Sequence, residues 1–118
     1  MKPVDQTQFY VKGISHGNCL QAAVASLLEL SLEEVPNFIE QKHFWGSFRN
    51  FLKSKGYNLE RIKLEDNPEE YYLVFGWSSR QVLHAVIYCG DKLAHDPHPS
   101  REGVLEITEK NKLIKVNE

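Results

Sequence analysis

Hydrophobic and polar positions follow a helical spacing in the first half of the chain and a strand spacing in the second half. From Cys19 to Leu30, small and apolar residues recur at helical intervals without Gly or Pro, which predicts a helix. A second amphipathic pattern predicts a helix from about His43 to Lys55, with Gly56 as the residue that ends it. The apolar stripe of this second helix is formed by Phe44, Trp45, Phe48, Phe51 and Leu52.

Two shorter segments flank the first predicted helix. The first 18 residues are mixed in character and turn-rich, with Gly13 and Gly17 as breaks. After the helix, Ser31 and Glu34 have the spacing of a capping box, which predicts a short helical turn that ends near Pro36.

The second half of the chain predicts short β-strands separated by turns. Alternating or continuous apolar runs lie at Tyr57–Leu64, Tyr71–Phe75, Val82–Cys89, Lys92–His95, Val104–Ile107 and Leu113–Val116. Gly90 and Asp91 predict a tight turn between the third and fourth of these runs. Because helices come first and strands follow, we expect an α+β fold in which N-terminal helices pack on an antiparallel β-sheet.

Length, composition and charge narrow the class of protein. With 118 residues the chain is expected to form a single domain over residues 1–118. A net charge of −2 with dispersed Lys and Arg predicts no nucleic-acid partner. The N-terminus lacks the apolar core of a signal peptide and no apolar run has the length of a membrane helix, so we expect a cytoplasmic protein without a membrane partner. Cys19 and Cys89 are expected to be free thiols, because disulfides are rare in that compartment. The sequence does not define the oligomeric state.

The segment His16-Gly17-Asn18-Cys19-Leu20-Gln21-Ala22-Ala23 carries the strongest chemical signal. It places a cysteine where a glycine-containing loop becomes a helix. A thiol in the first turn lies among unpaired N–H groups at the positive end of the helix dipole, which favours the thiolate form. Cys19 is therefore a candidate nucleophile.

An activated cysteine also needs an imidazole within hydrogen-bond reach and a third group that holds the imidazole tautomer. His84 begins an apolar strand, and Asp96 follows the next strand along the chain. A turn centred on Gly90 and Asp91 places His84 opposite a residue at about position 97, which brings Asp96 beside it. His84 is thus the candidate base and Asp96 the candidate orienting group. Each of these residue types more often has a structural role, so the catalytic interpretation depends on their combination.

A zinc site is the competing interpretation of the same residues. Cys19, His84, His95, Asp96 and His98 are all acceptable zinc ligands. No Cys-x-x-Cys or His-x-x-x-His pair supports a metal site, and His95 and Asp96 point to opposite faces if that segment is a strand. We therefore expect no metal, and no other cofactor.

Together these segments resemble a group of small papain-like cysteine peptidase-fold proteins from bacteria and phages. The resemblance covers about residues 4 to 105, and the segments that carry it are Gly17-Asn18-Cys19, Phe75-Gly76-Trp77-Ser78-Ser79-Arg80, His84-Ala85-Val86-Ile87 and His95-Asp96-Pro97-His98-Pro99. It implies a papain-like fold with Cys19 as nucleophile, His84 as base and Asp96 as orienting group.

The chain departs from this family at the oxyanion hole. Papain-like proteins usually place a Gln about six residues before the nucleophile, where this chain has Gly13. Gln6 and Gln8 lie further upstream. We expect Gln6 to supply the side-chain donor, and the backbone N–H of Cys19 to be the second donor.

Three further residues are candidates for substrate binding. Trp77 lies in a predicted loop and is suited to line a pocket, whereas the helical stripe assigns Trp45 to the core. Arg80 can bind a carboxylate or a phosphate in bidentate fashion, although solvated loop charge is the simpler interpretation for Arg80 and for Arg101. His98 either orients substrate or caps a turn.

Two residues are assigned lesser roles. Strand alternation puts Cys89 on the face opposite His84, which predicts a packing residue. His16 is assigned at most a supporting position near the nucleophile.

The combined expectation is a thiol-dependent hydrolase or acyl/amide transferase that uses Cys19, His84 and Asp96 and forms an acyl-enzyme. Its substrate would be a peptide, a protein or a small molecule with an amide, isopeptide or thioester bond. The alternative is a catalytically silent papain-like domain that acts as a binding or inhibitory module, for example in phage–host conflict. Labelling with a thiol-reactive probe distinguishes the two.

Overall fold

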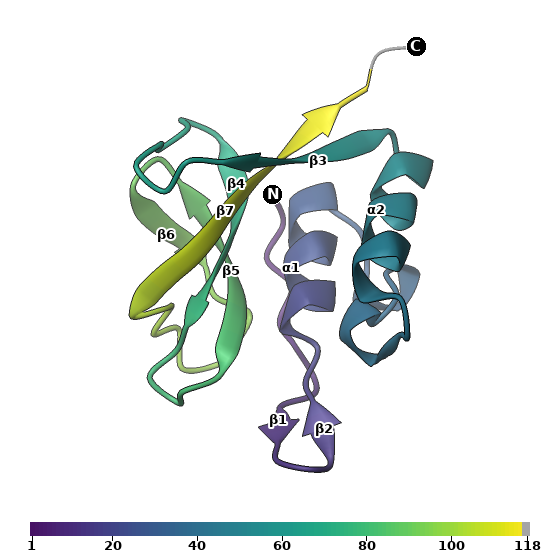
Figure 1. Cartoon of the computed structure of the whole chain (residues 1–118), viewed down its shortest axis with the longest axis vertical. Coiled ribbons are helices and arrows are strands. Elements are labelled where there is room, and N and C mark those ends of the chain that lie inside the picture. Colours follow the sequence, from purple (N-terminus) through teal and green to yellow (C-terminus); the bar gives the residue numbers. More distant parts are fainter. Residues whose placement is uncertain (117–118) are drawn as a thin grey trace.

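A computed structural model, which describes residues 1–116, has helices on one face of an antiparallel sheet, an α+β architecture as the sequence predicts (Figure 1). The helical layer contains α1, Cys19–Leu28, and α2, Phe44–Ser54. The short 3-10 helices η1, Leu32–Glu34, and η2, Phe38–Glu40, connect them. No helix within the described residues is both long and apolar enough to cross a membrane.

The sheet has five strands in the order β3-β7-β4-β5-β6, and each neighbouring pair is antiparallel. The strands are β3 (Tyr57–Ile62), β4 (Tyr71–Trp77), β5 (Leu83–Cys89), β6 (Lys92–His95) and β7 (Glu106–Lys115). α1 lies against β5 and β4, and α2 lies against β3. Cys89 pairs with Lys92 around the predicted turn, and a bulge between Ile87 and Tyr88 then shifts the register by one residue.

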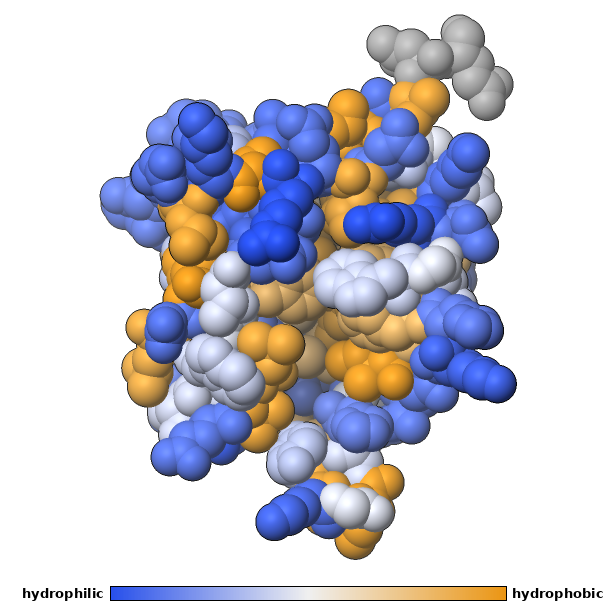
Figure 2. Space-filling model, viewed as in Figure 1, coloured by the Kyte–Doolittle hydropathy of each residue, from blue (hydrophilic) through white to orange (hydrophobic). Residues whose placement is uncertain are grey.

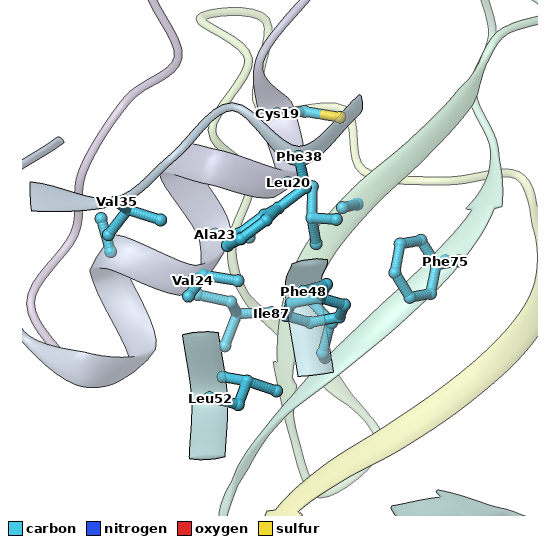
Figure 3. Packing of buried hydrophobic residues seen from close by; sticks show 13 residues of the cluster. Cys19, Leu20, Ala23, Val24, Val35, Phe38, Phe48, Leu52, Phe75 and Ile87 are labelled. Atoms are coloured by element: carbon cyan, nitrogen blue, oxygen red, sulfur yellow. The ribbon is translucent and has the colours of Figure 1, made fainter. Parts of the chain in front are cut away.

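Alternate residues of β4 belong to two different apolar clusters. Leu73 and Phe75 lie in the larger cluster under the helices. The other buried members of that cluster shown in Figure 3 include Leu20, Val24, Phe38, Phe48, Leu52 and Ile87. Tyr72 and Val74 belong to a smaller cluster that also contains Val86. β4 is therefore buried on both faces, which explains its nearly continuous apolar sequence and fixes the position of β5 beside it.

The two predicted strands Val104–Ile107 and Leu113–Val116 are wrong as separate elements, because β7 runs without interruption between them. The polar run in the middle of β7 has the composition of a loop but lies between β3 and β4. There Lys110 is only 3% exposed, and its ammonium group donates to the carbonyl oxygen of Asp66 at 2.7 Å. This bond and a second one, to Asn67 Oδ1 at 2.9 Å, offset the desolvation of the buried ammonium group.

The turn-rich N-terminal segment contains a hairpin that the sequence pattern does not predict. β1, Tyr10–Val11, pairs with β2, Ser15–His16, and the hairpin projects from the body near the start of α1 (Figure 1). Gly13 makes the turn possible with a φ of 76°. α1 ends at Leu28, earlier than predicted, because Glu29 adopts a left-handed C-cap with a φ of 57°.

Candidate active site

Cys19 is the first residue of α1, where the sequence places it. The chain enters the helix through Gly17, whose φ is 77°. A Cβ at Gly17 would lie 3.1 Å from the carbonyl oxygen of Gln8, so a larger residue would push the N-terminal segment away from the helix start. Figure 3 shows the Cys19 sulfur at the rim of the apolar cluster.

Asn18 fastens the N-terminal segment to the start of α1. Its side chain is buried, and Oδ1 accepts hydrogen bonds from the backbone N–H groups of Thr7, at 3.0 Å, and Gln8, at 2.8 Å. Its amide donates to Thr7 Oγ1 and to Gln21 Oε1. Because the Asn18 side chain makes no capping bond to α1, the first N–H groups of the helix stay available to a ligand.

His84 near the start of β5 and Asp96 just after β6 form a buried pair. His84 Nε2 lies 2.6 Å from Asp96 Oδ1. Both residues are almost completely buried. The structure therefore brings together the two residues that the hairpin register predicts to be neighbours.

The Asp96 carboxylate is held by backbone groups as well. Oδ1 accepts the N–H of His98 at 2.9 Å, and Oδ2 accepts the N–H of Gly103 at 2.8 Å. Burial alone would raise the pKa of Asp96, but the hydrogen bonds from His84 and from the two backbone groups outweigh it and lower that pKa to about 2. Asp96 is thus an ionised acceptor with a fixed orientation.

His84 lies between the Asp96 carboxylate and the Cys19 thiol. Burial lowers the pKa of His84, but the hydrogen bond with Asp96 and the proximity of Cys19 outweigh it and raise that pKa to about 9. Because Asp96 holds Nε2, Nδ1 is the ring nitrogen left for Cys19.

Gln6 lies in the same cavity as Cys19 and His84. Its backbone N–H donates to the carbonyl oxygen of Pro97 at 3.1 Å, and its Nε2 donates to the carbonyl oxygen of Gln8 at 2.9 Å. The second Nε2 hydrogen remains for a ligand, because a side-chain amide has two N–H donors. Gln6 Oε1 is buried and has no hydrogen-bond partner within residues 1–116. The position suits the predicted oxyanion donor.

Cys19 and His84 lie where two cavities meet, since both residues line each cavity. The first cavity has a volume of about 460 Å³ and a mainly apolar lining that includes Phe44, Trp45, Phe75, Trp77 and Leu83. The second has a volume of about 350 Å³ and a more polar lining that includes Gln6, His16, Arg80, Gln81 and His98. Figure 2 shows apolar residues along the seam between the sheet and α2.

The three predicted substrate-binding residues lie around these cavities. Trp77 lines the apolar cavity, while Arg80 and His98 line the polar one. The His98 ring stands edge-on to His84 with 6.2 Å between ring centroids. Its Nδ1 accepts the backbone N–H of Ser100 at 3.0 Å, so the proton of the neutral ring is on Nε2. Burial and the positive charge of Arg80 lower the pKa of His98, which favours this neutral form.

Trp45 is not a core residue, so that prediction is wrong. Its side chain is 42% exposed. One side of the indole contacts Phe75 and Phe48, with ring centroids 6.0 Å and 6.1 Å apart, and the remainder lines the apolar cavity. The helical stripe gives the correct direction, but none of the elements within residues 1–116 covers the exposed part of Trp45 at the start of α2.

The remaining candidates have other roles. Cys89 is half-buried at the far end of β5 and belongs to neither apolar cluster, a weaker packing role than the sequence indicates. His95 Nε2 lies 3.0 Å from the carbonyl oxygen of Val4 and so holds the N-terminal segment. Within residues 1–116 both cysteines are free, and no three His, Cys, Asp or Glu side chains are grouped to hold a metal ion.

Arg101 is more than the solvated loop charge that the sequence indicates. Its guanidinium donates to both carboxylate oxygens of Asp5, at 2.6 Å and 2.7 Å, and to the carbonyl oxygen of Asp96 at 2.6 Å. It therefore joins the segment before Gln6 to the loop that carries Asp96. No local pattern reveals this, because Asp5 and Arg101 are 96 positions apart.

Comparisons of the chain with protein-family models, with curated proteins and with solved structures find no match.

Proposed function

We propose that the protein is a thiol-dependent hydrolase or acyl transferase with Cys19 as nucleophile, His84 as acid and base, and Asp96 as orienting group. The observation that carries this proposal is the buried His84–Asp96 pair, whose imidazole lines the same two cavities as Cys19. The imidazole binds the buried Asp96 carboxylate at 2.6 Å through Nε2, which leaves Nδ1 for the Cys19 sulfur. A thiol in this position is also open to two cavities.

The topology supports a papain-like fold as part of the same proposal. In the resemblance described above, the nucleophile begins an N-terminal helix and the base and orienting group come from the sheet that follows. Here α1 carries Cys19, β5 carries His84, and Asp96 follows β6. The buried Gln6 amide at the site supports the same interpretation.

The proposed reaction has two steps. The Cys19 thiolate attacks a carbonyl carbon and forms an S–C bond, while the oxygen gains a negative charge that Gln6 Nε2 and the Cys19 N–H stabilise. The oxyanion then collapses, the bond to the leaving amine or thiolate breaks, and His84 gives its proton to the leaving group. Water or an amine next attacks the acyl-enzyme with His84 as base, which releases the acid or amide and restores the thiol.

Intact-protein mass spectrometry with an activated thioester tests the proposal. The wild-type protein should gain one acyl group on Cys19, and Cys19→Ala should gain none. His84→Gln should slow acylation by about 100-fold, because the general acid and the charge partner of the thiolate are lost. Cys89→Ala is the matched control and should react like the wild type. A wild-type protein that forms no adduct, or a His84→Gln variant that reacts at the wild-type rate, contradicts the proposal and favours a binding module.

A further inference from the structure

The two cavities beside Cys19 differ in the polar and charged groups that line them. No acidic side chain lines the polar cavity within residues 1–116, and Arg80 and His98 line this cavity alone, whereas His16 and His84 line both cavities. The apolar cavity is lined by aromatic side chains and by one carboxylate, Glu109. A negatively charged ligand group is therefore favoured in the polar cavity and disfavoured in the apolar one.

Arg80 has an unused capacity to bind an anion. Its guanidinium makes a single long hydrogen bond, to Ser100 Oγ at 3.4 Å, and no ion pair within the described part of the chain. The carboxylate of Glu102 lines neither cavity and accepts a hydrogen bond from Ser79 Oγ. Arginine is suited to bidentate binding of a carboxylate or a phosphate, and His98 offers an Nε2–H donor beside it.

The chemistry of acyl transfer decides which half of a substrate enters which cavity. The acyl group stays on Cys19 after the first step, while the leaving group departs and water takes its place. Water enters a polar cavity more readily than one lined by Trp45, Phe75 and Trp77. The polar cavity is therefore the exit of the leaving group, and the apolar cavity holds the acyl chain.

We propose that the site selects substrates that join a hydrophobic acyl group to an anionic leaving group. The acyl chain occupies the cavity beside Trp77 and Trp45, and the carboxylate or phosphate of the leaving group binds Arg80 and His98. This inference rests on the proposed function of Cys19 as nucleophile.

Three thioesters that share a phenylpropanoyl group test the leaving-group side. Their thiols are mercaptoacetate, mercaptomethylphosphonate and the neutral mercaptoacetamide. Each acylation rate of the protein is divided by the rate of the same thioester with free cysteine, which removes intrinsic differences in reactivity. We expect the normalised rate of at least one anionic ester to exceed that of the neutral ester by roughly tenfold, the effect of one charged contact. The two anionic arms distinguish carboxylate from phosphate recognition.

Variants separate the inference from the proposed function. Arg80→Gln should reduce the anionic-to-neutral ratio to near one, whereas Arg49→Gln, an exposed arginine that lines neither of these cavities, should keep the wild-type ratio. Trp77→Ala should reduce the ratio of phenylpropanoyl to acetyl transfer from the same thiol. Equal normalised rates for all three esters, or a preference that survives in Arg80→Gln, overturn the inference and leave Cys19 as nucleophile. The absence of acylation by every ester contradicts the inference and the proposed function together.

Discussion

The guanidinium of Arg101 binds the Asp5 carboxylate through two hydrogen bonds, at 2.6 Å and 2.7 Å. A third bond, at 2.6 Å, reaches the carbonyl oxygen of Asp96. Asp5 directly precedes Gln6, whose backbone N–H donates to Pro97. One ion pair therefore connects the segment that carries Gln6, the predicted oxyanion donor, with the loop that carries Asp96, although the two segments are far apart in the sequence.

Loss of this ion pair should impair acylation more than stability. Arg101→Gln should slow acylation of Cys19 several-fold, because Gln6 and Asp96 lose their common support. The unfolding free energy should change little, because both partners are half-exposed and solvent screens their attraction. Asp5→Asn should have the same effect, and the double variant should be no slower than either single variant. Additive losses of rate in the double variant would show that the two residues act independently.

Asn18 should be important for both stability and activity. Asn18→Ala leaves the N–H groups of Thr7 and Gln8 without their acceptor, so the unfolding free energy should fall by about 1–3 kcal/mol. Acylation of the folded fraction should also slow, since Gln6 is no longer held beside Cys19. The exposed Asn50→Ala on α2 should change stability by less than about 0.5 kcal/mol. Urea unfolding and acylation rates measure both effects, and an unchanged rate in folded Asn18→Ala would exclude the positioning role.

Much of the candidate site can be predicted from local sequence. A glycine before a helix that begins with Cys19 is a local pattern, and the tight turn at Gly90 sets the register that brings Asp96 to His84. The support of the site is not local. Asn18 and Arg101 act through Thr7 and Asp5, and these contacts depend on how the N-terminal segment lies across the folded domain.

Asp96→Asn tests the orienting carboxylate. An asparagine has one acceptor oxygen, so it cannot serve His84 and both backbone N–H groups as Asp96 does. The imidazole then loses its preferred tautomer, and acylation should fall by about 100-fold or more. Stability should fall by about 1–3 kcal/mol. Asp91→Asn in the exposed β5–β6 turn is the control. A folded Asp96→Asn variant with wild-type acylation would remove Asp96 from the mechanism.

The pKa values of the buried pair predict how stability depends on pH. The pKa of His84 rises from 6.5 to about 9 on folding, so its contribution is complete below pH 6.5 and is lost as the pH rises through 9. The pKa of Asp96 falls from 3.8 to about 2, so its contribution is present above pH 3.8 and is lost as the pH falls through 2. The two residues therefore favour a stability maximum between these windows.

Urea unfolding at pH 5, 7 and 9 checks the alkaline half of this profile. The wild-type protein should lose stability from pH 7 to pH 9. His84→Gln should show a flatter profile over the same range, whereas the exposed His43→Gln should keep the wild-type slope. A wild-type slope in His84→Gln would mean that His84 is not charged in the folded protein.

The fold shows the same division between local and long-range information. The spacing of apolar residues predicts α2 and the strands β3 to β6, but it does not predict the middle of β7. Lys110 is buried in the centre of the sheet because its ammonium group donates a hydrogen bond to the backbone carbonyl oxygen of Asp66, in the loop after β3. Trp45 is the opposite case: the apolar stripe of α2 predicts that it is buried, but no element within the described residues covers it.

The relative reactivity of Cys19 and Cys89 tests whether the proposed Cys19–His84 ion pair or simple solvent accessibility determines which thiol is labelled. Cys19 is buried and Cys89 is half-buried, so accessibility alone favours labelling of Cys89. The proposed pairing with His84 at the start of α1 instead predicts that Cys19 reacts first. At mildly acidic pH an unpaired thiol stays protonated and reacts slowly.

The most direct test is limited alkylation with iodoacetamide at about pH 6, well below the ordinary pKa of a thiol, read out by peptide mass spectrometry. The thiolate–imidazolium pair predicts that Cys19 is labelled first and that His84→Ala slows this labelling while Cys89 is unaffected. Faster or equal labelling of Cys89, or labelling of Cys19 at the same rate in His84→Ala, would contradict the ion pair and with it the proposed nucleophile.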